Sequence, residues 1–284
     1  MPQLTPRPTR CWRARASRSR LLLRQQDDGV IAIGQSSHAW LSGQLARAWG
    51  NPRFAPPKPY EEVCLAAEQH DIGMATWDLS PARNPSTGLP QSFTEMELET
   101  HLRLWSAAPS KLLAQSRYAA LLVSMHGHRL YELRDLDQLP IRDAQAVRSY
   151  FDAQRVLQRD LIASLRSDRK MADSAAPEPV ARNSQLIWTW DFLSLAICLD
   201  WAPCTARAVP SAAGPVELEL GRRPGRDGLT LAPWPFTPGK LQVRCEGRLL
   251  DGRAQSDAEL QEALASAPWQ TIEFELSARD GANR

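Results

Sequence analysis

Imidazole and carboxylate side chains, the usual protein ligands of zinc, manganese and iron, recur along the first two thirds of this chain. Six of them form the candidate ligand set: His38, His70, Asp71, His101, His126 and Asp191. In an adjacent His-Asp pair the ring can bind one ion while the carboxylate bridges to a second ion. The spacing therefore predicts a paired metal site, in which Asp71 is the bridge and the main catalytic residue.

Four of the five histidines fall on the apolar faces of separate predicted helices. His38, for example, shares a stripe with Leu41 and Leu45, at spacings of three and four residues. A single inward histidine is usually a hydrogen-bonded core residue. Several inward rings together with inward carboxylates are costly to desolvate, and a bound cation would offset that cost.

The elements that position these residues follow from apolar periodicity and from turn and cap signals. We expect a hairpin whose strands, 21–24 and 30–33, flank the turn Asp27-Asp28-Gly29. We expect six helices, over about 36–49, 60–70, 94–107, 110–126 (which ends with His126), 144–165 and 183–198. Strands are predicted at 216–220, 229–232, 241–245 and 271–276, with a helix at 256–267 that opens on the capping box Ser256 and Glu259.

These elements predict a mainly α fold: a helical metal-binding domain over 21–205, followed by a small β-rich C-terminal appendage over 214–280. The appendage either stands apart or packs on the helical body. Residues 1–20 are expected to be a basic, disordered leader, because residues 1–24 hold seven of the 34 basic residues and no acidic residue. A tail that binds nucleic acid or a membrane surface, a transit-like peptide and a plain extension are all compatible with that composition.

Several enzyme classes are excluded by missing motifs. The sequence has no Gly-rich phosphate loop and no G-x-S-x-G elbow, and no apolar run reaches the roughly 18 residues of a membrane helix. Five widely spaced cysteines without a C-x-x-C pair indicate free thiols in a reducing compartment, so we expect a cytoplasmic location.

Other polar residues are candidates for substrate contact. Arg83 and Asn84 lie in a long loop that follows Asp78 and could meet an anionic substrate, although a plain solvated loop fits equally well. His128 is either a substrate contact or a surface histidine. Asp200 competes with Asp191 for the last ligand position, and Asp191 is preferred because it shares a helix face with apolar residues.

The order His38, His70-Asp71 and Asp191 resembles the HD-domain superfamily, which is named for its adjacent His-Asp pair, over about residues 36–200. With His101 and His126 added, the order is similar to that of its dinuclear branch. The resemblance implies a helical bundle with two ions. It implies that His38, His70, Asp71 and Asp191 hold the first ion, and that Asp71, His101 and His126 hold the second. The segments 66–73 and 190–195 also resemble a bacterial family of unknown function, which implies no activity.

Three functions follow as expectations. The first is a metal-dependent phosphohydrolase that acts on a small anionic phosphate ester or anhydride, with two divalent ions among Mn, Fe, Mg, Co and Zn. The second is a di-iron oxygenase of the HD type, and the third is a non-enzymatic metal-binding sensor or adaptor. The acidic body of the chain does not favour nucleic acid as a partner, and no membrane partner is expected.

Overall fold

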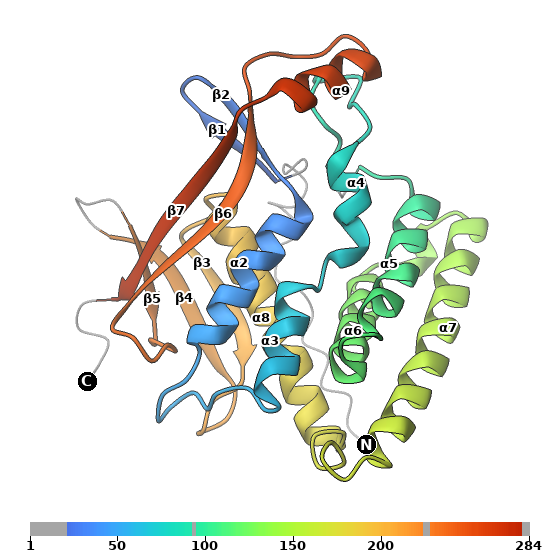
Figure 1. The fold of residues 1–284 in the computed structure, drawn as a ribbon, viewed down its shortest axis with the longest axis vertical. Helices are drawn as coiled ribbons and strands as arrows, with labels where there is room; N and C mark the ends of the chain where they lie inside the picture. Colours follow the sequence, from blue (N-terminus) through green and yellow to red (C-terminus); the bar gives the residue numbers. More distant parts are fainter. Residues whose placement is uncertain (1–21, 93–94, 224–227, 280–284) are drawn as a thin grey trace.

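A seven-stranded sheet runs along one side of the molecule in the computed structural model, which describes residues 22–92, 95–223 and 228–279 (Figure 1). The strands lie in the order β1-β2-β6-β7-β5-β4-β3, and all neighbours are antiparallel except β5 and β7. Their bounds are Leu22–Gln26 (β1), Gly29–Ile33 (β2), Cys204–Val209 (β3), Val216–Arg222 (β4), Leu229–Ala232 (β5), Lys240–Leu250 (β6) and Trp269–Ala278 (β7).

The helices form two further layers beside the sheet. Helices α2 (Gln35–Ala48) and α8 (Pro177–Cys198) pack on the sheet, with α3 (Tyr60–Glu68) next to them. The outer layer holds α5 (Leu98–Leu112), α6 (Arg117–Glu132) and α7 (Ile141–Arg166) (Figure 1). Short elements complete the described chain: η1 (Ile72–Met74), α4 (Ala75–Leu79), η2 (Leu136–Gln138) and α9 (Asp257–Ser266).

The predicted mainly α, HD-domain-like bundle with a small β-rich appendage is wrong. The structure is 49% helical and 21% strand, and its large curled mixed sheet is not an HD fold. The N-terminal hairpin joins the C-terminal strands, because Val30–Ile33 of β2 pairs with Gly247–Leu250 of β6. Pairing between segments so distant in sequence is not encoded in local periodicity, so the pattern revealed most of the strands but not the sheet.

Most individual elements agree with the sequence patterns. The hairpin, the helices α2, α3 and α7 and the strands β4 to β7 lie where expected, within a few residues. Ser256 caps α9 by accepting from the Glu259 N–H at 3.2 Å, which confirms the cap. The helix expected from residue 110 begins instead at Arg117, after the cap Ser116, and β3 was missed altogether. The helix expected over 183–198 begins earlier, at Pro177, and the leader 1–20 lies outside the described residues.

Helix α2 is hydrogen-bonded to β6 through its side chains. Ser37 Oγ donates to the Glu246 carbonyl and accepts from the Glu246 N–H, both at 2.8 Å. Gln44 makes the same paired contact with the backbone of Arg244, at 2.8 and 3.0 Å. These bonds satisfy β6 backbone groups beyond the end of β2, so α2 continues the line of that strand and is fixed against the sheet.

An aromatic cluster joins the helices to the sheet. The Trp49 ring makes edge contacts with Phe54, Trp190 and Phe236, with centroids 5.5, 5.6 and 5.7 Å apart. These four side chains are almost fully buried. Edge-to-face pairs add stability beyond the apolar area they bury, so Trp49 and Trp190 act as packing residues here.

Among the described helices, none combines the length and the apolar composition that crossing a membrane requires.

Gly73 allows the turn after α3 to lie against α5. A Cβ on Gly73 would stand 2.5 Å from the carbonyl oxygen of Leu104 and 3.0 Å from Ala108 Cβ. Backbone cannot yield as a flexible side chain does, so Gly73→Ala should lower the free energy of unfolding by about 1–3 kcal/mol. Urea unfolding measures this. The control Gly239→Ala, whose Cβ would meet nothing within 4 Å, should stay within about 0.5 kcal/mol of wild type. Equal values for the two variants would contradict this account of the contact.

Candidate metal centre

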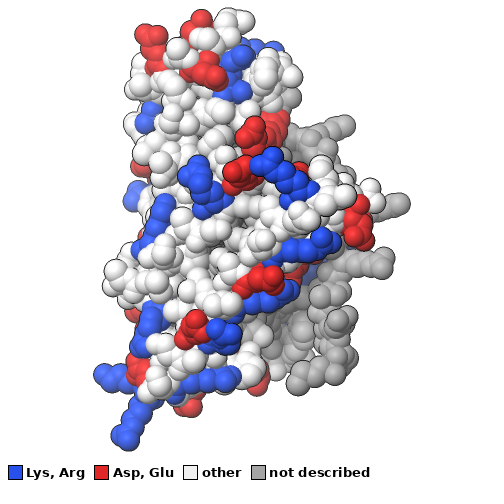
Figure 2. Space-filling model, turned by 90° about the vertical axis from the view of Figure 1, so that its right-hand side faces the viewer, with Lys and Arg blue, Asp and Glu red and all other residues white. Residues whose placement is uncertain are grey.

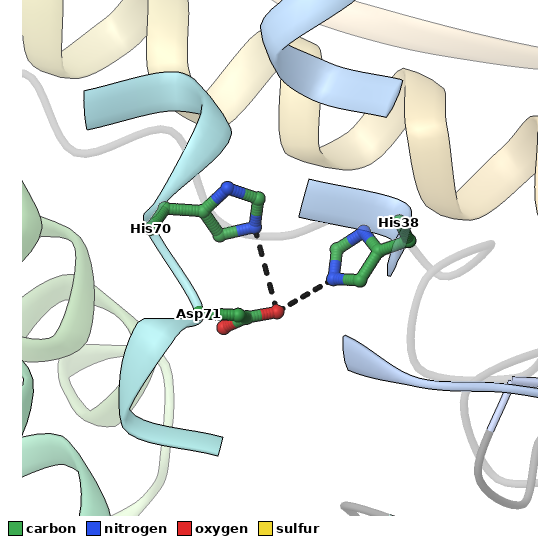
Figure 3. Close-up of side chains that lie close together, drawn as sticks. All are labelled: His38, His70 and Asp71. Carbon is green, nitrogen blue, oxygen red and sulfur yellow. Dashed lines mark hydrogen bonds and ion pairs between the residues drawn. The ribbon is translucent and has the colours of Figure 1, made fainter. Parts of the chain in front are cut away.

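Five of the six predicted ligands converge where the helices meet. His38 comes from α2, His70 and Asp71 from the turn after α3, His126 from α6 and Asp191 from the middle of α8. Two overlapping groups have ligand atoms within 4.8 Å of one another: His38, His70 and Asp71, and His70, His126 and Asp191. Figure 3 shows the first group, with both rings turned toward the Asp71 carboxylate. We call these five residues the cluster.

Ring nitrogens and carboxylate oxygens face each other throughout the cluster. Asp71 Oδ2 lies 2.6 Å from His38 Nε2 and 3.5 Å from His70 Nε2 (Figure 3). Asp191 Oδ1 lies 3.4 Å from His70 Nε2, and its Oδ2 lies 3.6 Å from His126 Nε2. Every one of the five side chains is buried, so solvent does little to screen these charges.

In His70 and His38, the ring nitrogen Nδ1 makes a hydrogen bond outside the cluster. We call Nδ1 the outer nitrogen of these rings, and Nε2, which faces the carboxylates, the inner nitrogen. His70 Nδ1 donates to the Ala67 carbonyl at 2.8 Å. His38 Nδ1 lies 3.0 Å from Ser194 Oγ. That hydroxyl donates its one proton to the Asp191 carbonyl, so it accepts from His38. Outer hydrogen bonds of this kind fix the tautomer of metal-binding histidines.

The inner nitrogens of these two rings therefore have no proton to donate when the imidazoles are neutral. Both Nε2 lone pairs then point at carboxylate oxygens, which also carry lone pairs. His70 Nε2 is buried and makes no hydrogen bond within the described residues. A cation between the rings and the carboxylates, either protons or a metal ion, removes this repulsion. The donor set fits a divalent metal ion on this ground.

Without a metal ion, the charges of the cluster shift its pKa values in opposite directions. Burial lowers the pKa of His70, but the charges of Asp71 and Asp191 outweigh burial and raise it to about 9. Burial raises the pKa of Asp71, but His70 and His38 outweigh it and lower the value to about 2. The pKa of Asp191 is likewise lowered, since its histidine neighbours outweigh its burial. Both carboxylates are thus ionised near neutral pH.

His126 contacts Asp191 from the side of the outer helices. Its ring lies between those of Trp105 and Trp188, each with its centroid 5.6 Å away. Burial lowers the pKa of His126 to about 4, so the ring is neutral and can act as a ligand.

His101 does not join the cluster. Its Nε2 accepts from Trp105 Nε1 at 3.1 Å, and its Nδ1 is therefore the protonated nitrogen that contacts the Tyr131 hydroxyl. Both nitrogens of His101 are occupied by other side chains. The set Asp71, His101 and His126, which the resemblance implied for a second ion, is not assembled. The helix face was predicted correctly, but periodicity does not say which neighbours a ring will meet.

The three predicted substrate contacts also lie elsewhere. The His128 ring stacks on Phe151 at 4.5 Å, on the side of α7. The Arg83 N–H donates to Asp257 of α9, and Asn84 organises its own turn by accepting from the Ser86 N–H. The structure brings none of the three to the cluster.

Asp200, the rival ligand, lies at the end of α8, where it forms an ion pair with Arg222. The preference for Asp191 over Asp200 agrees with the positions of both residues in the structure.

Sequence reasoning missed the hydroxyls behind the rings. Ser42 Oγ donates to Ser194 Oγ at 2.8 Å, and Ser194 holds His38. Ser42 follows His38 by four residues and Ser194 follows Asp191 by three, which places each serine on the same helix face as its ligand. The spacing of three or four residues between each serine and the cluster residue on its helix is the sequence signal that could have revealed these hydroxyls.

Asp78, which precedes the long loop, fixes the start of α2. Its Oδ2 accepts from the Ser36 N–H at 2.8 Å, two residues before His38. Burial raises the pKa of Asp78. The residue ties α4, which follows the His-Asp turn, to the helix that carries His38.

The pKa shifts predict that the metal-free protein is most stable near pH 6.5. The His70 pKa is raised to about 9, so its contribution is complete below 6.5 and is lost as pH rises toward 9. The pKa values of His101 and His126 are lowered to about 4, so stability also falls as pH drops from 6.5 toward 4. Each shift is worth up to about 3 kcal/mol.

Urea unfolding in chelator at pH 5, 6.5 and 8.5 measures this profile. His101→Asn should make the loss of stability toward acid pH smaller, leaving the part due to His126, and should not change the loss toward alkaline pH. Stability that rises steadily from pH 5 to 8.5 would contradict the assigned shifts.

Comparison with known proteins gives a match to a family described as a protein of unknown function (DUF3891), over residues 21–252. No HD-domain family matches, so the resemblance to that superfamily is corrected. No curated protein and no solved structure matches the chain. The matched region contains the whole cluster and the strands β1 to β6. Because the match covers most of the sequence, this chain belongs to the DUF3891 family.

Proposed function

We propose that this protein is a metal-dependent hydrolase of phosphate esters or anhydrides, with Asp71 at its catalytic centre. The observation that carries the proposal is the placement of two buried carboxylates against the unprotonated inner nitrogens of His38 and His70. The two positive charges of a divalent ion would balance the two negative charges of these carboxylates. Site composition, rather than similarity of fold, is the ground for the proposal.

The first ion would be held by the four residues around the shared centre: His38, His70, Asp71 and Asp191. His126 would hold a second ion together with Asp191, whose Oδ2 lies 3.6 Å from His126 Nε2. Nitrogen-rich donors of this kind suit Mn, Fe, Co or Zn better than Mg. When bound, such ions acidify water and stabilise charge on a phosphoryl group.

The chain's own residues favour hydrolysis without a protein nucleophile. The hydroxyls of Ser42 and Ser194 both donate to acceptors within the fold. The carboxylates are the more accessible side of the cluster, with the Asp71 and Asp191 side chains 8% and 11% exposed against 0–3% for the three rings. A substrate would therefore approach over the carboxylates, where Asp71 can orient water and accept its proton.

A small substrate fits the surface better than nucleic acid does. On the face over which α7 lies, basic and acidic side chains alternate without a stripe of one sign (Figure 2). Long polyanions bind to continuous basic tracks, and this face has none. A cytoplasmic location is part of the proposal, supported by Cys64, Cys198, Cys204 and Cys245, which form no disulfide in the described chain.

An iron oxygenase is the second candidate. Each of the two overlapping groups contains two histidines and one aspartate, the composition of the non-haem iron site that activates dioxygen. Metal identity separates the two functions. Bound iron with substrate-dependent oxygen consumption favours oxidation, and phosphate release with Mn, Co or Zn favours hydrolysis.

Metal content per chain, measured by plasma mass spectrometry on untagged protein, tests the proposal. Wild type should carry one to two ions, and Asp71→Ala should lose most of them, because an inner ligand and half of the anionic charge are removed. The control Asp200→Ala removes a surface aspartate and should leave the content unchanged. His126→Ala should retain the first ion.

Activity is tested on the same samples with aryl phosphates and with pyrophosphate. Asp71→Ala should reduce phosphate release by at least about 100-fold, more than the loss typical of an outer-shell change. Wild-type protein that gains no ion from added Mn, Fe, Co or Zn would overturn the metal centre and leave the histidines as core residues.

A further inference from the structure

Arg129 is a half-buried cation beside the cluster. It follows His126 by three residues on α6, so the two side chains leave neighbouring positions of one helix surface. Its Cζ lies 4.4 Å from the centre of the Trp188 ring, and its Nη1 donates to Gln185 Oε1 at 2.8 Å. Helix α8 therefore holds the guanidinium from two sides, by a ring face and by an amide.

No carboxylate within the described residues forms an ion pair with Arg129. A guanidinium has five N–H donors, and the one hydrogen bond to Gln185 leaves most of them available. Removing such a cation from water without an anionic partner is unfavourable. A cation next to a metal centre is stabilised when an anion binds between them.

Trp188 connects Arg129 to the cluster. The same indole that carries the guanidinium lies 5.6 Å from the His126 ring, between centroids. Both Arg129 and Trp188 are partly exposed, so a ligand from solvent can reach them. The contacts with Trp188 and Gln185 restrict the guanidinium, and its planar fork suits two oxygens of one phosphate group.

We infer that Arg129, held by Trp188 and Gln185, binds a phosphate group of the substrate beside the metal centre. The inference rests on the proposed function and narrows it. Arg129 lies on the side of the cluster where His126 is, whereas the attack would take place at Asp71. Arg129 therefore holds a phosphate group other than the one that is attacked. The substrate class is therefore a phosphate anhydride or another compound with two phosphate groups.

Binding of inorganic pyrophosphate to the metal-loaded protein, measured by calorimetry, tests this assignment. Arg129→Gln should weaken the affinity about tenfold or more, the loss expected for one charge-assisted hydrogen bond. Arg129→Lys should recover part of it, because a lysine keeps the charge but not the fork. Inorganic phosphate, with one group only, should bind more weakly than pyrophosphate and be less affected by Arg129→Gln.

The matched control is Arg155→Gln on α7. Arg155 also stands over a ring, with its Cζ 5.6 Å from the centre of Phe151, but it pairs with Asp152 and lies outside the cluster. Its loss should leave pyrophosphate affinity unchanged. If Arg129→Gln binds pyrophosphate as wild type does and is only less stable to urea, Arg129 is a packing residue and the inference is wrong.

Metal content measured on the same samples separates the two proposals. A full metal complement without pyrophosphate binding overturns the phosphate site and leaves the metal centre standing. Protein that takes up no metal overturns the proposed function itself.

Discussion

The burial of two carboxylates next to each other is the constraint on which this structure depends. Asp71 and Asp191 come from segments 120 residues apart, and each lies within 3.5 Å of His70 Nε2. Like charges that close repel strongly in a medium of low dielectric constant. The rings of the cluster are what make the arrangement tolerable, and they come from α2, α6 and the turn after α3. Compensating these two charges therefore ties the layer on the sheet to the outer helices.

The sheet acts as the support of this centre rather than as an appendage. Ser37 and Gln44, on either side of His38 along α2, bond to the backbone of β6. Trp49 at the end of α2 packs against Trp190, the residue before Asp191. The two helices that supply His38 and Asp191 are thus fixed on one curled sheet. Ligands must be held to within a fraction of an ångström, and a sheet that spans both ends of the chain supplies that rigidity.

Sequence patterns predicted which side chains lie together better than they predicted the fold, for a physical reason. An inward position on a helix follows from local spacing, and five of the six residues expected to be ligands do lie together. His101 also points inward, but Trp105 and Tyr131 take its nitrogens, and only the packing of α5 against α6 decides that. The sheet depends on pairs such as Val30 with Leu250, which no local pattern encodes. The order of ligands along a chain likewise does not determine a fold, which is why the resemblance to a helical superfamily failed.

The charge balance of the cluster would allow the proposed metal ion to bind within a buried, stable core. The outer nitrogen of His38 donates to Ser194, and its Nε2 lies 2.6 Å from Asp71 Oδ2. His70 takes up a proton below its raised pKa of about 9, and this charge offsets part of the charge of the two carboxylates. A divalent ion in the proposed site would take the place of that proton and neutralise both carboxylates by an exchange of cations. The surrounding hydrogen bonds, from Ser194 to His38 and from His70 to Ala67, lie on the outer nitrogens and are unchanged by that exchange.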